Sequence, residues 1–172
     1  MKTSLILSIV SSIAIIAFFA QFSIDLSING GLIPITGQTF AVLLVGYFLG
    51  KKWGTLAVAL YVLLGLAGLP ILADGKAGWS VLTSGSGGYL IGFIIGAFAC
   101  GWLRERMTPN FFNAFLNQTI GTIIILTFGV AWLSYLHGFG KALEYGFYPF
   151  WVGAVVKVVL AAGVIIGVRK FT

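Results

Sequence analysis

Six long apolar runs constrain this chain more than any other feature of its sequence. They cover approximately residues 3–22, 32–50, 54–72, 88–103, 115–135 and 149–168. A helix that crosses a bilayer needs about 20 predominantly apolar residues, and these runs reach or approach that length. None of them alternates apolar and polar residues as barrel strands do. The sequence therefore predicts an all-α membrane protein built as a six-transmembrane-helix bundle.

The composition supports a single membrane domain. The 172 residues are 59% hydrophobic and only 8% charged, and the mean hydropathy is +1.07. A water-soluble domain of this length does not have such a composition. We therefore expect residues 1–172 to form one integral domain within the lipid bilayer.

The basic residues predict how the bundle is oriented. If all six runs cross, one side carries Lys2, Lys51, Lys52, Arg104, Arg106, Arg169 and Lys170, and the other carries Lys76 and Lys141 beside Asp25, Asp74 and Glu144. Basic residues prefer the cytoplasmic side, so we expect both termini to be cytoplasmic. The net charge of +6 then reflects membrane topology, and no nucleic-acid partner is expected.

Lys157 is the only charged residue inside the last apolar run. A lysine at bilayer depth costs about 3 kcal/mol on insertion scales, so it normally faces a cavity or an anionic partner. Gly153 and Ala154 lie on the same helical face and leave room beside it for a ligand. The alternative is a lysine that snorkels to the headgroups. The small neighbours favour the ligand-facing arrangement.

Catalytic chemistry is not expected from this sequence. The acidic residues are Asp25, Asp74, Glu105 and Glu144, all of them in predicted loops, and the single cysteine, Cys100, lies in an apolar run. No nucleophile and base, metal-ligand spacing or paired carboxylates occur, so we expect neither an enzyme nor a bound metal or cofactor. A nucleotide-binding motif is also missing, and ATP hydrolysis would need separate subunits.

Two polar stretches can contribute to a binding site. Thr36, Gln38 and Thr39 stand at the start of the second run, and a helix cap explains one threonine but not the glutamine. The loop over residues 70–88 is rich in glycine and serine yet carries apolar residues such as Trp79 and Val81. We expect this loop to fold over the outer mouth of the bundle as a lid.

Small residues recur at a spacing of four in several runs. They are Ser4, Ser8 and Ser12 in the first run, Gly46, Gly50 and Gly54 around the second, and Gly88, Gly92 and Gly96 in the fourth. Such ridges predict close helix packing. For the serine ridge, packing inside the bundle and a surface for a partner subunit are both open.

Four blocks of sequence resemble the BioY family, the biotin-specific substrate-binding components of energy-coupling-factor transporters. They are residues 34–39 (PITGQT), residues 61–70 (YVLLGLAGLP), residues 87–93 (GGYLIGF), and Pro149-Phe150 together with Lys157. The blocks lie between residue 33 and the end of the chain. The second and third are the most specific.

The resemblance implies a biotin-capture protein of a prokaryotic cytoplasmic membrane. Its partners would be a transmembrane coupling subunit, contacted by Ser4, Ser8 and Ser12, and two ATPase subunits. Two departures stand out. The family commonly has an acidic residue where this chain has Ala154, and its glycine loop usually reads GPTGGY where residues 84–89 here read SGSGGY.

The resemblance and the residues together define a predicted site. The carboxylate of biotin would pair with Lys157, and the apolar parts of biotin would lie against Trp79, Tyr89 and Phe93. The ureido group would form hydrogen bonds with Gln38, Thr36 and Ser86. Gly87 and Gly88 would permit the backbone to approach the ligand closely. The alternative function is a stand-alone secondary transporter or facilitator for biotin or another small organic anion. Its weakness is the lack of an intramembrane carboxylate for proton coupling.

Overall fold

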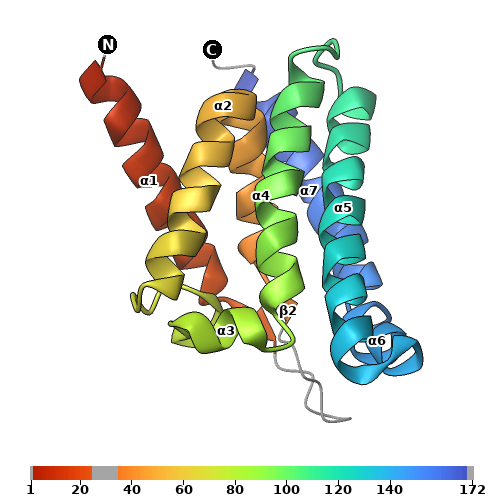
Figure 1. The fold of residues 1–172 in the computed structure, drawn as a ribbon. Helices are drawn as coiled ribbons and strands as arrows, with labels where there is room; N and C mark the ends of the chain where they lie inside the picture. The colour runs from red at the N-terminus through yellow and green to blue at the C-terminus, as the bar shows by residue number, and fades with distance from the viewer. Residues whose placement is uncertain (1, 25–34, 170–172) are drawn as a thin grey trace.

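The structure is a computed structural model that describes residues 2–24 and 35–169. Five of its helices are long and apolar enough to cross a membrane: α1 (Lys2–Ala20), α2 (Gln38–Leu66), α4 (Gly87–Arg104), α5 (Phe111–His137) and α7 (Trp151–Arg169). Figure 1 shows them packed as one bundle. A helix satisfies the backbone hydrogen bonds of each apolar run within the run itself. This is required because lipid offers no water to bond to. The predicted all-α membrane fold is confirmed.

Short elements gather at one end of this bundle. They are the 3-10 turn η2 (Ala73–Gly75), the helices α3 (Trp79–Thr83) and α6 (Phe139–Gly146), and the antiparallel pair β1 (Ser23–Ile24) and β2 (Ile35–Thr36). The apolar periodicity did not predict any of them. Asp25, Pro34 and Lys170, which entered the sequence predictions, lie outside the described residues.

The helix α2 bends sharply at Gly50 and so covers most of the second and third predicted spans, 32–50 and 54–72. Gly50 has φ 76° and ψ 174°, a backbone conformation that only glycine adopts cheaply. The two arms fold back on each other, because a Cβ added to Gly54 would lie only 2.8 Å from the Cα of Gly46. The spacing of Gly46, Gly50 and Gly54, which predicted close helix packing, therefore reflects contact between the two arms of α2.

The helix α4 lies between α2 and α5 (Figure 1). Gly46 of α2 packs against the backbone of Ala97 in α4, and a Cβ added to Gly92 would lie 3.0 Å from the Cα of Ile125 in α5. Missing side chains at these positions let the backbones approach closely. The predicted close packing along the fourth run is confirmed.

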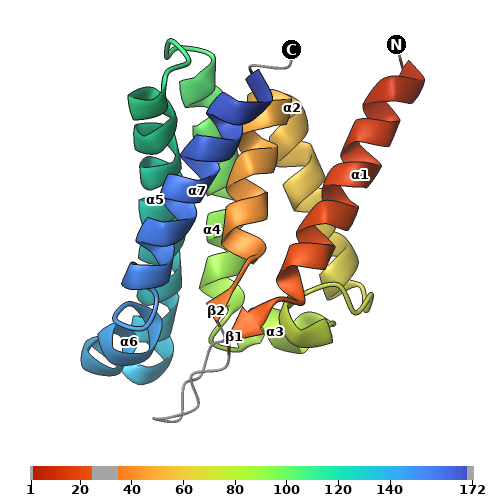
Figure 2. The ribbon, with the colours of Figure 1, turned by 180° about the vertical axis from the view of Figure 1, so that it is seen from behind.

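The helix α1 packs against the bundle from about Ile9 onward. Ser12, Ile16 and Ala20 are buried, whereas Leu7 and Val10 are mostly exposed. Figures 1 and 2 show the first turns of α1 diverging from the other helices. The start of α1, the end of α7 and the Gly50 bend lie at the same end of the bundle (Figure 1).

That shared end carries most of the described basic residues. Lys51 forms an ion pair with Glu105 at 2.7 Å, and Arg104 donates to the Phe48 carbonyl at 2.9 Å. The hydrogen bond from Lys51 holds the pKa of the Glu105 carboxyl below its usual range. Lys76 and Lys141 lie in the elements at the opposite end.

Candidate ligand-binding site

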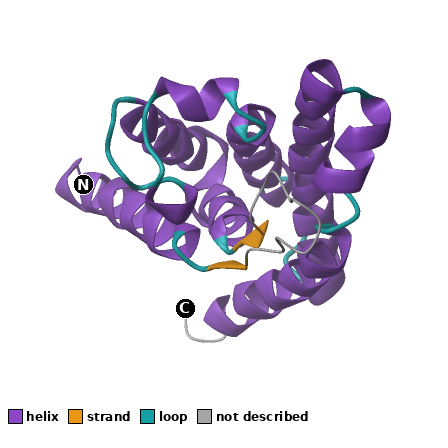
Figure 3. Cartoon of the chain, turned by 90° about the horizontal axis from the view of Figure 1, so that it is seen from below, coloured by secondary structure: helices purple, strands orange, loops and turns teal. Residues whose placement is uncertain are grey.

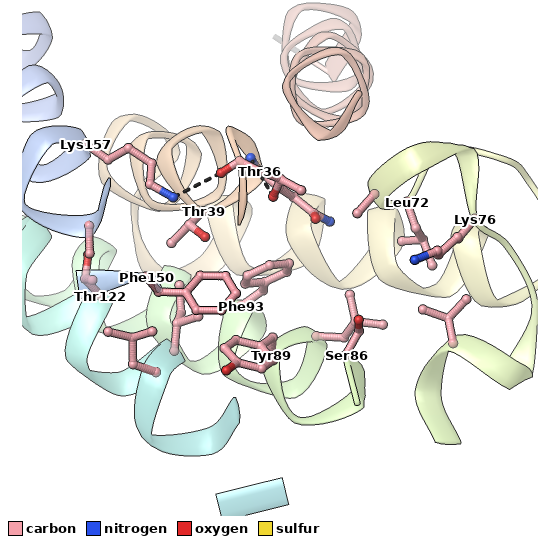
Figure 4. Close-up of a pocket in the computed structure, with 17 residues that line it drawn as sticks. Thr36, Thr39, Leu72, Lys76, Ser86, Tyr89, Phe93, Thr122, Phe150 and Lys157 are labelled. Carbon is pink, nitrogen blue, oxygen red and sulfur yellow. Dashed lines mark hydrogen bonds between the residues drawn. The ribbon is translucent and has the colours of Figure 1, made fainter. Parts of the chain in front are cut away.

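A pocket opens at the end of the bundle where β2 and α3 lie. Figure 3 looks onto this end and shows the two strands near its middle. The pocket is lined by Thr36, Gln38, Thr39, Leu72, Ala73, Lys76, Val81, Ser86, Tyr89, Leu90, Phe93, Thr122, Ile125, Leu126, Phe150, Ala154 and Lys157. Figure 4 shows how they surround the pocket from different elements. Most of the lining surface is apolar, as in small-molecule sites generally.

Lys157 enters this pocket from α7. Its side chain is half-buried, and its ammonium donates to the Thr36 carbonyl at 3.0 Å (Figure 4). The ion pairs within residues 2–24 and 35–169 are Lys51 with Glu105 and Lys76 with Asp74, so no described carboxylate neutralises Lys157. The small Ala154 lines the pocket beside it. The prediction that Lys157 faces a cavity is confirmed.

One wall of the pocket is aromatic. Tyr89 and Phe93 come from α4, and Phe150 precedes α7, with its ring centroid 5.9 Å from that of Tyr89. The Tyr89 hydroxyl donates to the Gly146 carbonyl at 2.7 Å, which holds the ring in place. The predicted positions of Tyr89 and Phe93 in the site agree with the structure. Phe150 was not predicted as a site residue, although its place just before the lysine-bearing helix was a usable signal.

Hydrogen bonds within the protein hold the polar side of the pocket in place. Gln38 is buried, and its Nε2 donates to the Tyr61 hydroxyl at 2.7 Å. Tyr61 in turn donates to the Ile71 carbonyl at 2.8 Å. Gln38, Thr36 and Ser86 all line the pocket, as predicted, and their contacts with a ligand stay a prediction.

Residues 70–88 cover this mouth of the bundle, where the sequence places a lid. Leu72 and Val81 are buried and face the pocket. The segment is held to the end of α1, because Gln21 donates to the Leu72 carbonyl at 3.2 Å and Ser23 donates to the Asp74 carboxylate. That this end faces outward, and that the segment opens and closes as a lid, stay predictions.

Lys76 was missed by the sequence prediction. It lines the pocket from the covering segment, and its ammonium lies 3.7 Å from the Asp74 carboxylate. Figure 4 shows it at the opposite side of the pocket from Lys157. A surface lysine in a glycine-rich loop gave no signal in the sequence that it would turn toward a site.

Three predicted ligand contacts do not line the pocket. Trp79 begins α3, and its side chain is 66% exposed and does not line this pocket, so its contact with a ligand stays a prediction. Gly87 and Gly88 pack elsewhere, because a Cβ on Gly88 would meet the backbone of Phe128 in α5. Gly87 packs closely against the backbone of Leu82 in α3, and Gly88 lets α4 approach α5. Close approach of a ligand to these glycines stays a prediction.

The three serines of α1, Ser4, Ser8 and Ser12, differ in their exposure. Ser12 is 5% exposed and donates to the Ser8 carbonyl at 2.7 Å, whereas Ser4 and Ser8 lie on the exposed side. Ser12 therefore packs inside the bundle. Only Ser4 and Ser8 remain on a surface that a partner subunit can contact.

The helices, their exposed apolar outer surface and the pocket at one end define an integral membrane protein with an internal pocket. The BioY family model matches residues 1–172, and the chain belongs to the BioY family.

Named relatives and a solved structure agree with this assignment. The biotin transporter BioY of Thermotoga maritima is 45% identical over 146 residues, 84% of this chain and 86% of that protein. The probable biotin transporter BioY of Pyrococcus horikoshii is 34% identical over 160 residues, 93% of this chain and 94% of that protein. A crystal structure of the S-component for biotin from an ECF-type ABC transporter superimposes with a TM-score of 0.81 at 25% identity and covers 98% of this chain and 92% of that one.

Proposed function

We propose that this protein captures biotin and takes part in its uptake as the substrate-binding subunit of an ECF-type ABC transporter. Family membership and the biotin-transporter relatives support the ligand. The observation that carries the mechanism is Lys157, a cation in the pocket with no carboxylate partner among the described residues. A ligand carboxylate offsets the cost of burying that charge.

The pocket offers a place for each part of biotin. The carboxylate pairs with Lys157, the ring system lies against Tyr89 and Phe93, and the ureido group bonds to Gln38, Thr36 and Ser86. Phe150 adds to the aromatic wall. A ligand enclosed by apolar walls and fixed by a few polar groups is bound tightly and selectively.

The protein crosses a prokaryotic cell membrane six times with both termini in the cytoplasm. The bend at Gly50 supports this number, since each arm of α2 then crosses once. The basic end of the bundle supports the orientation, because basic residues prefer the cytoplasmic side. The pocket then opens outward, where biotin arrives.

The partners are a transmembrane coupling subunit and two ATPase subunits. The apolar face of α1, with Leu7, Val10 and Phe18 largely exposed, supports a helix contact in the membrane. Ser4 and Ser8 lie at the exposed end of α1, where small side chains permit close approach.

The test compares how removal of Lys157 or of Lys76, the two lysines that line the pocket, changes the affinity for biotin and for its neutral amide. Lys157→Ala is expected to weaken biotin binding by about a hundredfold, because the ligand carboxylate loses its buried partner. Binding of neutral biotin amide is expected to change by less than about tenfold. Calorimetry of the purified protein with both ligands measures this difference.

Lys76→Ala is the matched control, since Lys76 lines the same pocket but is half-exposed and paired with Asp74. It is expected to lower the affinity for biotin by less than about fivefold. If Lys76→Ala discriminates between biotin and its amide and Lys157→Ala does not, the ligand lies the other way round and the role proposed for Lys157 is wrong.

A further inference from the structure

A second, smaller cavity adjoins the ligand pocket. The residues that line both are Thr39, Thr122, Ala154 and Lys157. Its volume is about 10 Å³, which is about the room that one water molecule needs and too little for a larger ligand. Lys157 therefore borders two spaces, one for a ligand and one that only water fits.

Gln118 of α5 forms part of the wall of this second cavity. Its side chain is 1% exposed, and its Oε1 is the buried side-chain polar atom of the described chain that has no hydrogen-bond partner. A buried acceptor without a donor destabilises a fold, so such atoms are usually satisfied by ordered water.

The neighbouring hydrogen bonds fix which amide atom is left over. Asn117 donates from Nδ2 to the Cys100 carbonyl at 2.8 Å, and a carbonyl can only accept. The Oδ1 of Asn117 then accepts from Gln118 Nε2 at 3.2 Å. If the Gln118 amide were flipped, its Oε1 would face Asn117 Oδ1, and both atoms are acceptors. The amide is therefore oriented as described, and Oε1 is the atom that needs a donor.

Lys157 has hydrogen-bonding capacity to spare. An ammonium carries three N–H groups, and the Thr36 carbonyl accepts one of them at 3.0 Å. A water molecule in the second cavity can accept a second N–H from the ammonium. It can at the same time donate to Gln118 and to a threonine hydroxyl, which matches the usual number of partners of a buried water.

We propose that one ordered water molecule occupies this cavity and joins the Lys157 ammonium to Gln118 Oε1. Gln118 is then a positioning residue, because it acts on the ligand-binding cation through the water. With one N–H on the Thr36 carbonyl and one on the water, the third remains for a ligand in the main pocket, which Lys157 also lines. The consequence for selectivity rests on the proposed function, in which that N–H meets the biotin carboxylate.

A crystal structure that resolves ordered waters tests the site directly. We expect a water about 2.7–3.2 Å from both Lys157 Nζ and Gln118 Oε1. An empty cavity, or a protein donor bonded to Oε1, would overturn the proposal. This measurement uses the unmodified protein and does not depend on whether any variant folds.

Gln118→Glu tests the link to the cation. A carboxylate one water away neutralises the ammonium, so biotin binding is expected to weaken about tenfold or more, with biotin amide changed less than about threefold. Gln118→Met, which removes the acceptor without adding charge, is expected to weaken biotin binding about threefold. Equal effects of Gln118→Glu on both ligands, or none on either, would refute the role of Gln118.

The same assay separates two kinds of failure. If Lys157→Ala fails to distinguish biotin from its amide, the proposed pairing with the ligand is wrong. If Lys157→Ala distinguishes them and Gln118→Glu does not, only the water-mediated positioning is wrong.

Discussion

Among the residues that the structure describes, the ammonium of Lys157 is held by a carbonyl dipole and not by a charge. The Thr36 carbonyl accepts one hydrogen bond from it at 3.0 Å, but a neutral acceptor leaves the positive charge in place. Ala154 stands where the family commonly has an acidic residue, so the chain offers no substitute there. The charge is therefore best compensated by an anion that enters from the pocket.

Tyr61 connects the polar side of the pocket to the covering segment. Its hydroxyl accepts from Gln38 and donates to the Ile71 carbonyl. Tyr61→Phe leaves both partners unsatisfied and is expected to cost about 1–3 kcal/mol of stability. Thermal unfolding in detergent measures the loss. Tyr135→Phe is the control, because Tyr135 is 82% exposed, and an unchanged melting temperature for Tyr61→Phe would contradict this role.

Trp79 and Phe93 give opposite expectations for binding. Trp79 is 66% exposed and outside the pocket, so Trp79→Ala is expected to leave biotin affinity within about twofold. Phe93 is buried in the aromatic wall, and Phe93→Leu is expected to weaken biotin binding about tenfold. Fluorescence or calorimetric titration of both variants provides the comparison. A larger effect at Trp79 than at Phe93 would mean that the ligand lies outside this pocket.

At the scale of the elements, the bend in α2 depends on one residue. Gly50 has φ 76°, where a side chain is strained, and Gly50→Ala is expected to cost about 1–3 kcal/mol. Gly163→Ala in α7 is the matched control, since nothing lies within 4 Å of an added Cβ there. Thermal unfolding of the two variants in the same detergent should show a loss for Gly50 alone. Equal melting temperatures would mean that the bend tolerates an ordinary residue.

Most of the long helices could be predicted from the sequence, because bilayer thickness requires long apolar runs. The last run, 149–168, corresponds to α7, and the fourth, 88–103, to α4. The sequence predicted two separate spans on either side of Gly50 and not one bent helix. Two apolar runs joined by a basic turn have the same sequence pattern in both cases. The short helices α3 and α6 were missed because they are too short for a periodic pattern to reveal them.

The site was harder to predict than the helices. Lys157 could be found because a charge in an apolar run needs an explanation. The exposure of Trp79 could not be predicted, because an aromatic residue in a loop carries no signal of which way its side chain turns. Lys76 and Gln118 were missed for a related reason: only the packing of α5 and the covering segment against other helices brings them to the two cavities.

At the scale of the whole molecule, binding and transport are expected to be separable. In the proposed function the energy for uptake comes from partner subunits, and this protein supplies the binding site. In liposomes it is expected to bind biotin but not to accumulate it. Accumulation is expected only with the coupling subunit, both ATPase subunits and ATP. Biotin accumulation by this protein alone would favour a stand-alone secondary transporter instead.

A crystal structure with biotin bound tests the central claim most directly. The account predicts a biotin carboxylate oxygen about 2.7–2.9 Å from Lys157 Nζ, with the ring system against Tyr89 and Phe93. A carboxylate placed at Lys76, with the ureido group at Lys157, would contradict it.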